Sequence, residues 1–167
     1  MRAAFARALP RVELHPGSAE AIPLADGSFD VVTAGQAFHW FETQRALAEM
    51  HRVTRPGGGF ALTWNRWTED DPILNGVQLV LQENRSKPAP WRDEYLDGLF
   101  GPIEQRTFDE RRLLTADALV AWAASTSPFV TAPAAQQADF AHRIRELVGA
   151  PEAEVTVSTL VVVADRA

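Results

Sequence analysis

The stretch Gly17-Ser18-Ala19-Glu20-Ala21-Ile22-Pro23-Leu24-Ala25-Asp26-Gly27-Ser28-Phe29-Asp30-Val31-Val32-Thr33-Ala34-Gly35-Gln36-Ala37-Phe38-His39-Trp40-Phe41 carries most of the information about the architecture of this chain. Its centre, Phe29 to Ala34, is a nearly unbroken apolar run between Asp26-Gly27-Ser28 and Gly35-Gln36. A short apolar run bounded by turn residues is typical of a strand that is covered on both faces of a sheet. We therefore predict a buried strand over 29–35 that ends in a crevice.

A helix and a further strand follow this run. From Glu42 onward, apolar residues recur at helical spacing as far as Val53, and Pro56-Gly57 is predicted to end the helix. Glu49 and Arg52 are three positions apart on it and are expected to form a weak ion pair. The pattern of Gly58 to Asn65 then favours another strand. A strand, a helix and a strand in such close succession predict a right-handed crossover between parallel neighbours.

The remaining segments predict additional helices and strands. Local patterns and capping residues favour helices before Pro10, over Pro72–Arg85 with Asp70-Asp71 as its cap, over Trp91–Leu99, after Thr115 and over Ala134–Val148, and strands over Val12–His15, Ile103–Leu113 and Glu154–Ala164. The last two strands are expected to pair in antiparallel fashion. Together these elements predict an α/β fold in a single domain, residues 1–167.

Composition excludes several classes of function. The chain has 167 residues, 16 basic and 22 acidic, and a formal charge of -6, so neither nucleic acid nor an anionic membrane is an expected partner. It contains no cysteine, and its four histidines lack the paired spacing of zinc ligands, so we expect no metal site. A small-molecule partner is the remaining expectation.

Localisation is inferred from the apolar runs. The apolar run near the C-terminus, Leu160 to Ala164, is too short to span a bilayer. The N-terminus carries Arg2, Arg7 and Arg11 among alanines, a pattern found in transit peptides as well as in amphipathic helices. We favour the helix and expect a soluble, cytoplasmic protein.

Several of these motifs together resemble a known family. Ile22-Pro23, Phe29-Asp30-Val31-Val32 and His39-Trp40-Phe41, followed by Arg55-Pro56-Gly57-Gly58-Gly59-Phe60-Ala61-Leu62, resemble the class I S-adenosylmethionine-dependent methyltransferases of type 11. The resemblance implies an incomplete Rossmann-like methyltransferase fold, with a mainly parallel sheet and an antiparallel C-terminal strand pair. The Gly-rich motif G-x-G-x-G that the family carries before this region does not occur in the 167 residues.

The resemblance also implies where S-adenosylmethionine binds. In the family, the turn matching Ser18, Ala19 and Glu20 lies along the adenine, and the strand end matching Gly35, Gln36 and Ala37 lies near the methionine. The missing Gly-rich turn is the part that lets the backbone approach the donor closely, so we expect binding to be weakened in this chain.

The aromatic residues after this strand end are the candidates for the acceptor side. The resemblance places Phe38, Trp40 and Phe41 beside the acceptor pocket, where their rings would exclude water. His39 is the candidate general base for an acidic acceptor. The alternative is that His39, Trp40 and Phe41 are only the packed beginning of the next helix.

Two functions stay open at this point. The first is an S-adenosylmethionine-dependent methyltransferase for a small molecule, impaired or inactive as this chain. The second is a non-enzymatic remnant of the fold that serves as a binding or dimerisation module. Without the family's first strands, the apolar strand 29–35 has an open edge, which we expect Val12–His15 or a second copy in a homodimer to cover. A nicotinamide-dependent dehydrogenase is disfavoured because the dinucleotide fingerprint does not occur.

Overall fold

The computed structural model describes residues 2–67, 70–82, 96 and 98–167. Its elements are α1 (Arg2–Ala8), β1 (Phe29–Gly35), the 3-10 helix η1 (Phe38–Trp40), α2 (Thr43–Val53), β2 (Thr54–Trp67), α3 (Pro72–Gln82), β3 (Glu104–Thr115), α4 (Ala116–Ala123), α5 (Ser127–Thr131), α6 (Ala134–Val148) and β4 (Glu152–Asp165). Among the described residues, none of the helices has the length and apolar character that a bilayer crossing requires.

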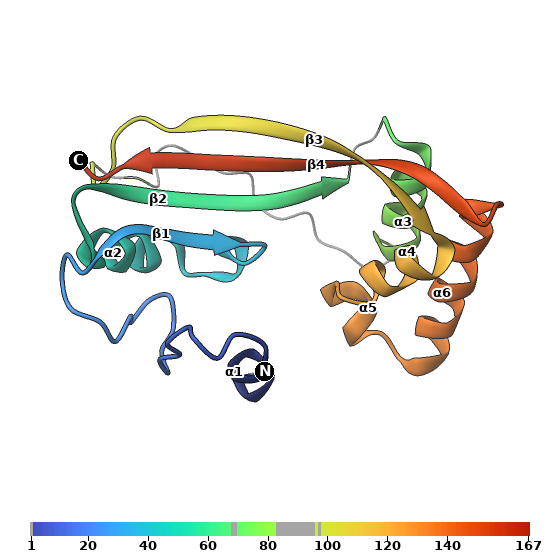
Figure 1. Ribbon diagram of the computed structural model, residues 1–167, viewed down its shortest axis with the longest axis horizontal. Helices are drawn as coiled ribbons and strands as arrows, with labels where there is room; N and C mark the ends of the chain where they lie inside the picture. The colour runs from blue at the N-terminus through green and yellow to red at the C-terminus, as the bar shows by residue number, and fades with distance from the viewer. Residues whose placement is uncertain (1, 68–69, 83–95, 97) are drawn as a thin grey trace. The chain divides into compact units, whose positions relative to one another are not determined.

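The strands form a sheet in the order β1-β2-β4-β3. Figure 1 shows β1 and β2 running in the same direction, whereas β4 runs opposite to both β2 and β3. The predicted mixed α/β fold and the antiparallel C-terminal pair are therefore confirmed. The parallel part consists of β1 and β2, which α2 connects as the predicted crossover.

The chain divides into two compact units, and the first spans Met1–Leu62, Trp91–Glu104 and Val162–Ala167. In this unit, α2 buries Ala46, Leu47, Met50 and Val53, and β2 buries Phe60 and Leu62. The ring of Phe60 meets that of Phe100 edge-on, with centroids 4.8 Å apart. Apolar burial of this kind is the main source of stability in the unit.

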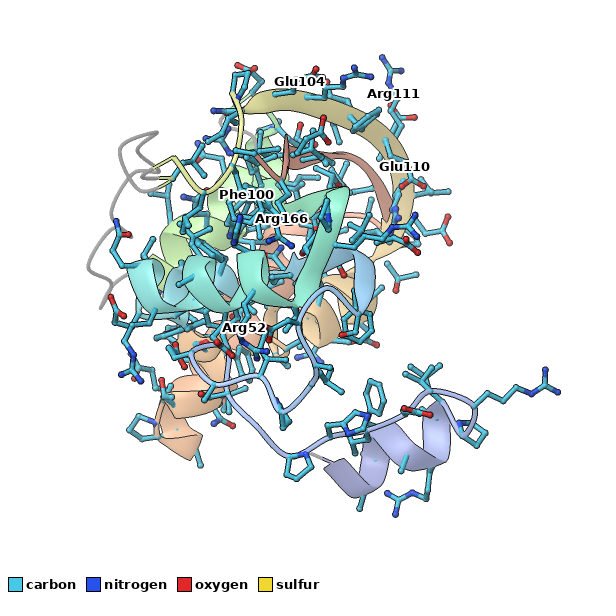
Figure 2. The ribbon with its side chains drawn as sticks, turned by 90° about the vertical axis from the view of Figure 1, so that its left-hand side faces the viewer. Arg52, Phe100, Glu104, Glu110, Arg111 and Arg166 are labelled. Carbon is cyan, nitrogen blue, oxygen red and sulfur yellow. The ribbon has the colours of Figure 1, made fainter. Side chains whose placement is uncertain are left out.

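The C-terminal end of the chain is fixed within the first unit. The Nε of Arg166 donates to Nε2 of His51 over 3.1 Å, and the backbone N–H of Arg166 donates to the carbonyl of Gly58 over 2.7 Å. Burial and the nearby guanidinium lower the pKa of His51, which favours the neutral ring that this hydrogen bond requires as its acceptor. Arg166 and Phe100 are labelled in Figure 2.

The second unit spans Thr63–Pro90 and Gln105–Val161 and contains an apolar core. That core joins α3, α4, α5, α6 and β4 through Leu74, Val77, Val80, Leu81, Leu119, Ala123, Phe129, Phe140, Ile144, Val148, Val155 and Val157. The predicted caps are confirmed. Oδ1 of Asp71 accepts from Ile73 and Leu74 N–H at 3.0 and 2.9 Å, and Thr115 accepts from Ala118 N–H at 3.1 Å.

The prediction that 29–35 is covered on both faces is wrong. The bounds of β1 match the predicted strand, but Phe29 is 39 % exposed and Val31 52 % exposed. Phe29, Val31 and Thr33 alternate along the strand, so they share one face of the sheet, and all three are exposed there. β1 also lies at an edge, and in the described part of the chain β2 is the strand that pairs with it.

Other boundaries also differ from the predictions. Val12–His15 is not a strand, and its residues are exposed. α2 ends at Val53, so Pro56 and Gly57 lie inside β2 rather than in a turn. The helix predicted over Trp91–Leu99 falls largely outside the described residues, and α5 was not predicted.

Candidate functional site

The candidate site begins at the turn Ser18–Glu20. Ser18 and Ala21 form an isolated antiparallel bridge, with 3.2 Å from the Ala21 N–H to the Ser18 carbonyl. The carboxylate of Glu20 accepts the backbone N–H of Glu42 over 3.0 Å. This hydrogen bond is the main reason that the pKa of Glu20 is lowered. Ala19 lies in the turn between these two anchors and is partly buried.

The second part of the site follows the carboxyl end of β1. After Gly35, Gln36 has φ 52°, in the left-handed region that residues other than glycine rarely occupy. Ala37 then leads into η1 with φ −127°. Residues in such sparsely populated backbone conformations cluster at functional sites. The conformation of Gln36 therefore makes this strand end a candidate for a functional role.

The aromatic residues separate into one buried ring and an exposed pair. Phe38 is 4 % exposed and meets Phe41 edge-on, with ring centroids 5.6 Å apart. Trp40 is 66 % exposed, and the ring of the exposed His39 lies 5.1 Å from it between centroids. η1 ends before α2 begins at Thr43, so these residues form a turn of their own. The rings of His39 and Trp40 are therefore exposed to solvent beside the strand end.

One hydrogen bond joins the turn 18–20 to the beginning of α2. Glu42, whose N–H binds Glu20, comes directly after Phe41 and is the N-cap of α2. Its own carboxylate accepts the Arg45 N–H over 3.0 Å. The turn 18–20 is thus attached to the N-cap of α2, and both lie within the first unit.

An ion-pair network holds the connection that leads into β1. Nε of Arg52 donates to Oε1 of Glu49 over 2.8 Å, and Nη2 donates to Oε2 over 2.8 Å. The Arg52 guanidinium also reaches the carbonyls of Leu24 at 2.9 Å and Ile22 at 2.8 Å, and Asp26 at 2.6 Å. Figure 2 labels Arg52. This one side chain fixes most of the segment between the turn and the strand.

Glu49 completes the network from the other side. Its Oε2 accepts the N–H of Ile22 over 2.7 Å. The hydrogen bonds from Arg52, and then that from Ile22, lower the pKa of Glu49 to about 2. The sequence indicated only a weak local pair here. The long-range acceptors are carbonyls of irregular backbone, and such contacts leave no sequence pattern.

An open groove of about 380 Å³ runs along the first unit's part of the sheet. It is lined by Asp30 and Val31 of β1, Gly57–Ala61 of β2 and Val163–Asp165 of β4. A Cβ on Gly58 would collide with the carbonyl oxygen of Asp30, and one on Gly59 with that of Ala164. The glycines therefore permit close strand approach. None of the predicted site residues lines this groove.

Comparison with known proteins identifies relatives. A family model described as a methyltransferase domain matches residues 1–62. An uncharacterized methyltransferase of Mycobacterium bovis is 36% identical over 142 residues, 84% of this chain and 57% of that protein. A methyltransferase-like protein of Schizosaccharomyces pombe is 36% identical over 116 residues, 66% of this chain and 45% of that protein. The chain spans about half the length of these curated relatives.

Solved structures agree with these matches. A protein described as a type II methyltransferase from Anaeromyxobacter dehalogenans aligns with TM-score 0.56 and 26% identity, covering 94% of this chain and 72% of that one. The YcgJ protein from Bacillus subtilis shares the fold with TM-score 0.55 and 18% identity, covering 99% of this chain and 76% of that one. The resemblance seen in the motifs is confirmed.

Proposed function

We propose that this chain, a relative of the class I S-adenosylmethionine-dependent methyltransferases, supplies one wall of a methyl-donor site for a small-molecule acceptor, and that methyl transfer is impaired in the chain as it stands. The hydrogen bond from Glu42 N–H to Glu20 is the observation that supports this most directly. It ties the turn 18–20 to Glu42, which follows the strand end 35–37 and η1 along the chain. The turn and the strand end are the two segments that would face the donor.

The residues present fit the donor only in part. Backbone at Gly35–Ala37 and the turn at Ser18–Glu20 offer polar groups on one side. The Glu20 carboxylate already accepts one hydrogen bond, and the sequence contains no Gly-rich turn for the methionine end. A small ligand binds tightly when most of its surface is buried. This incomplete fit supports weak binding, and we derive no transfer step from it.

The acceptor side rests on the exposed aromatic pair. We assign the rim of the acceptor pocket to Trp40, which is 66 % exposed beside the strand end, and we assign to Phe38 and Phe41, which pack against each other, the support of this turn. His39 is the candidate base, since its ring is exposed next to Trp40. A small acceptor fits this proposal better than a nucleic acid because the chain is acidic.

A specific observation favours the second candidate, a non-enzymatic binding or dimerisation module. β1 is a sheet edge with exposed Phe29 and Val31, which is a surface suited to a protein partner. A binding or dimerisation module needs no methyl donor, so a measurement of S-adenosylhomocysteine binding distinguishes the two candidate functions.

Isothermal titration calorimetry with S-adenosylhomocysteine tests the proposal. We expect millimolar binding that weakens about fivefold in Glu20→Ala, because the turn loses its anchor. Glu13→Ala is the matched control, since the Glu13 side chain is 89% exposed and its carboxylate contacts His15. If no heat of binding is measured at millimolar S-adenosylhomocysteine, the result favours the non-enzymatic binding or dimerisation module. Tight binding with turnover of small acceptors would contradict the proposed impairment.

A further inference from the structure

The guanidinium of Arg52 on α2 has every one of its N–H groups engaged within the chain. It donates hydrogen bonds of 2.6 to 2.9 Å to Oε1 and Oε2 of Glu49, Oδ1 of Asp26 and the carbonyls of Ile22 and Leu24. A guanidinium carries five N–H donors in a fixed planar fork, so the positions of its acceptors are fixed relative to one another. Three of these five bonds reach the segment that leads into β1.

Ile22 is held at both of its backbone polar groups. Its N–H donates to Oε2 of Glu49 over 2.7 Å, and its carbonyl accepts from Nη2 of Arg52 over 2.8 Å. Residues 22–26 lie outside helices and strands, so a hydrogen-bonded ladder does not order them. The pair Glu49–Arg52 does for Ile22 what a neighbouring strand does for a residue in a sheet: it satisfies both groups and fixes their direction.

This attachment extends to the turn 18–20. The N–H of Ala21, the residue before Ile22, donates to the carbonyl of Ser18 over 3.2 Å and closes the turn. On the other side, Glu20 accepts the N–H of Glu42 over 3.0 Å. The turn is therefore tied to the N-cap of α2 through Glu20 and to the last turns of α2 through Ile22.

The pair Glu49–Arg52 is more sheltered from water than a typical surface ion pair. The side chains of Arg52 and Glu49 are 31% and 20% exposed, whereas those of Arg111 and Glu154, which also form an ion pair, are 78% and 63% exposed. Exposed pairs compete with water and hold little in place. The pair on α2 is thus suited to fix the geometry of the segment that it binds.

We propose that Glu49 and Arg52 are positioning residues for the methyl donor: they hold Ile22, and through it the turn Ser18–Glu20, in the conformation that the donor binds. This inference rests on the proposed function, which assigns the turn to the donor wall. Arg52 acts without touching the donor, since its N–H groups are engaged. The apparent affinity of a ligand falls with the fraction of molecules in the binding conformation, so loss of the pair weakens binding.

NMR titration of isotope-labelled variants with S-adenosylhomocysteine tests this assignment. We expect Arg52→Ala to bind about threefold more weakly than the wild-type chain, because the turn is ordered in fewer molecules. Arg52→Lys keeps the charge but has three donors and no planar fork, so it should bind about twofold more weakly. Arg111→Ala is the matched control and should bind as the wild-type chain does. Circular dichroism verifies that each variant is folded.

Amide hydrogen exchange separates positioning from general stability. At saturating S-adenosylhomocysteine, the ligand must order the segment itself in Arg52→Ala, so binding should slow exchange in 19–27 more in this variant than in the wild-type chain. The amide shifts of Glu20 and Gln36 in the two saturated proteins should then coincide. A merely structural role would not produce this additional protection on binding.

The outcomes distinguish this assignment from the proposed function. A wild-type chain that does not bind S-adenosylhomocysteine overturns the proposed function and this assignment with it. Binding that Arg52→Ala leaves unchanged overturns this assignment alone. Full affinity in Arg52→Lys would overturn it as well, since the assignment depends on a hydrogen-bond geometry that lysine does not reproduce.

Discussion

The two units of this chain differ in how they hold their parts together. In the second unit, a continuous set of buried apolar side chains joins its helices to β4, and buried Asp71 links α3 to β4 by accepting the Thr156 N–H over 2.7 Å. In the first unit, the segment before β1 is held mainly by the polar bonds of Glu49 and Arg52, and β1 is exposed. The second unit is thus stabilised mainly by apolar packing around its helices, whereas the segment that leads into β1 depends on a few polar contacts.

The largest expected effect comes from opening the apolar core of the second unit. Phe140→Ala removes a ring that is 2 % exposed and lies 6.0 Å from that of Phe129, so we expect a loss of about 3–5 kcal/mol in the free energy of unfolding. Urea denaturation measures it. Leu79→Ala, at a position 60% exposed, should cost less than about 0.5 kcal/mol. Similar losses for both would contradict a closed core.

A second prediction concerns the buried cap of α3. Asp71→Ala leaves the N–H groups of Ile73, Leu74 and Thr156 without their acceptor, and we expect about 2–3 kcal/mol of destabilisation. The neighbouring Asp70 is exposed, so Asp70→Ala should have little effect. Thermal unfolding of the two variants side by side makes the comparison. If they melt alike, the link from α3 to β4 is not a source of stability.

In the first unit, loss of Arg52 should act locally. Arg52→Ala removes the donors that hold Ile22, Leu24 and Asp26, so amide hydrogen exchange in 19–27 should speed up by about tenfold, with the second unit unaffected. Arg111→Ala breaks an exposed 3.5 Å pair with Glu154 and is the control. Faster exchange throughout the chain would show that the two units do not differ in this way.

The smallest expected effect is a pH dependence of the same segment. The pKa of Glu49 in the folded chain is lowered to about 2 from 4.5, so its contribution to stability is present above pH 4.5 and is lost as the pH falls toward 2. Exchange in 19–27, corrected for the intrinsic rate, should therefore rise across this range. Glu49→Gln should flatten the profile. If the exchange rate of the wild-type chain varies with pH as little as that of the variant, the network does not lower the pKa of Glu49.

Elements governed by local signals could be predicted from the sequence. Asp71 and Thr115 were predicted as caps, and α6 begins and ends as its pattern indicated, with Gly149 at φ 58° as its C-cap. Such signals depend on residues a few positions apart. The bounds of β1 were predicted for the same reason.

Features that depend on distant neighbours could not be predicted. An apolar run indicates a strand, but Val31 would be buried only if neighbouring elements packed against the strand. The sequence of the run does not indicate whether such elements are present. The contacts of Arg52 with Ile22 and Leu24 join segments with no common pattern. At the candidate site, the residues came from the family resemblance, while the hydrogen bond between Glu20 and Glu42 came from the structure.

The most direct test of the proposed donor wall is an NMR titration of isotope-labelled chain with S-adenosylhomocysteine. The proposal predicts millimolar binding, with the largest amide shifts at Glu20, Gln36 and Glu42 and little change in the second unit. Saturation without shifts at these amides, or shifts concentrated in the second unit, would contradict it.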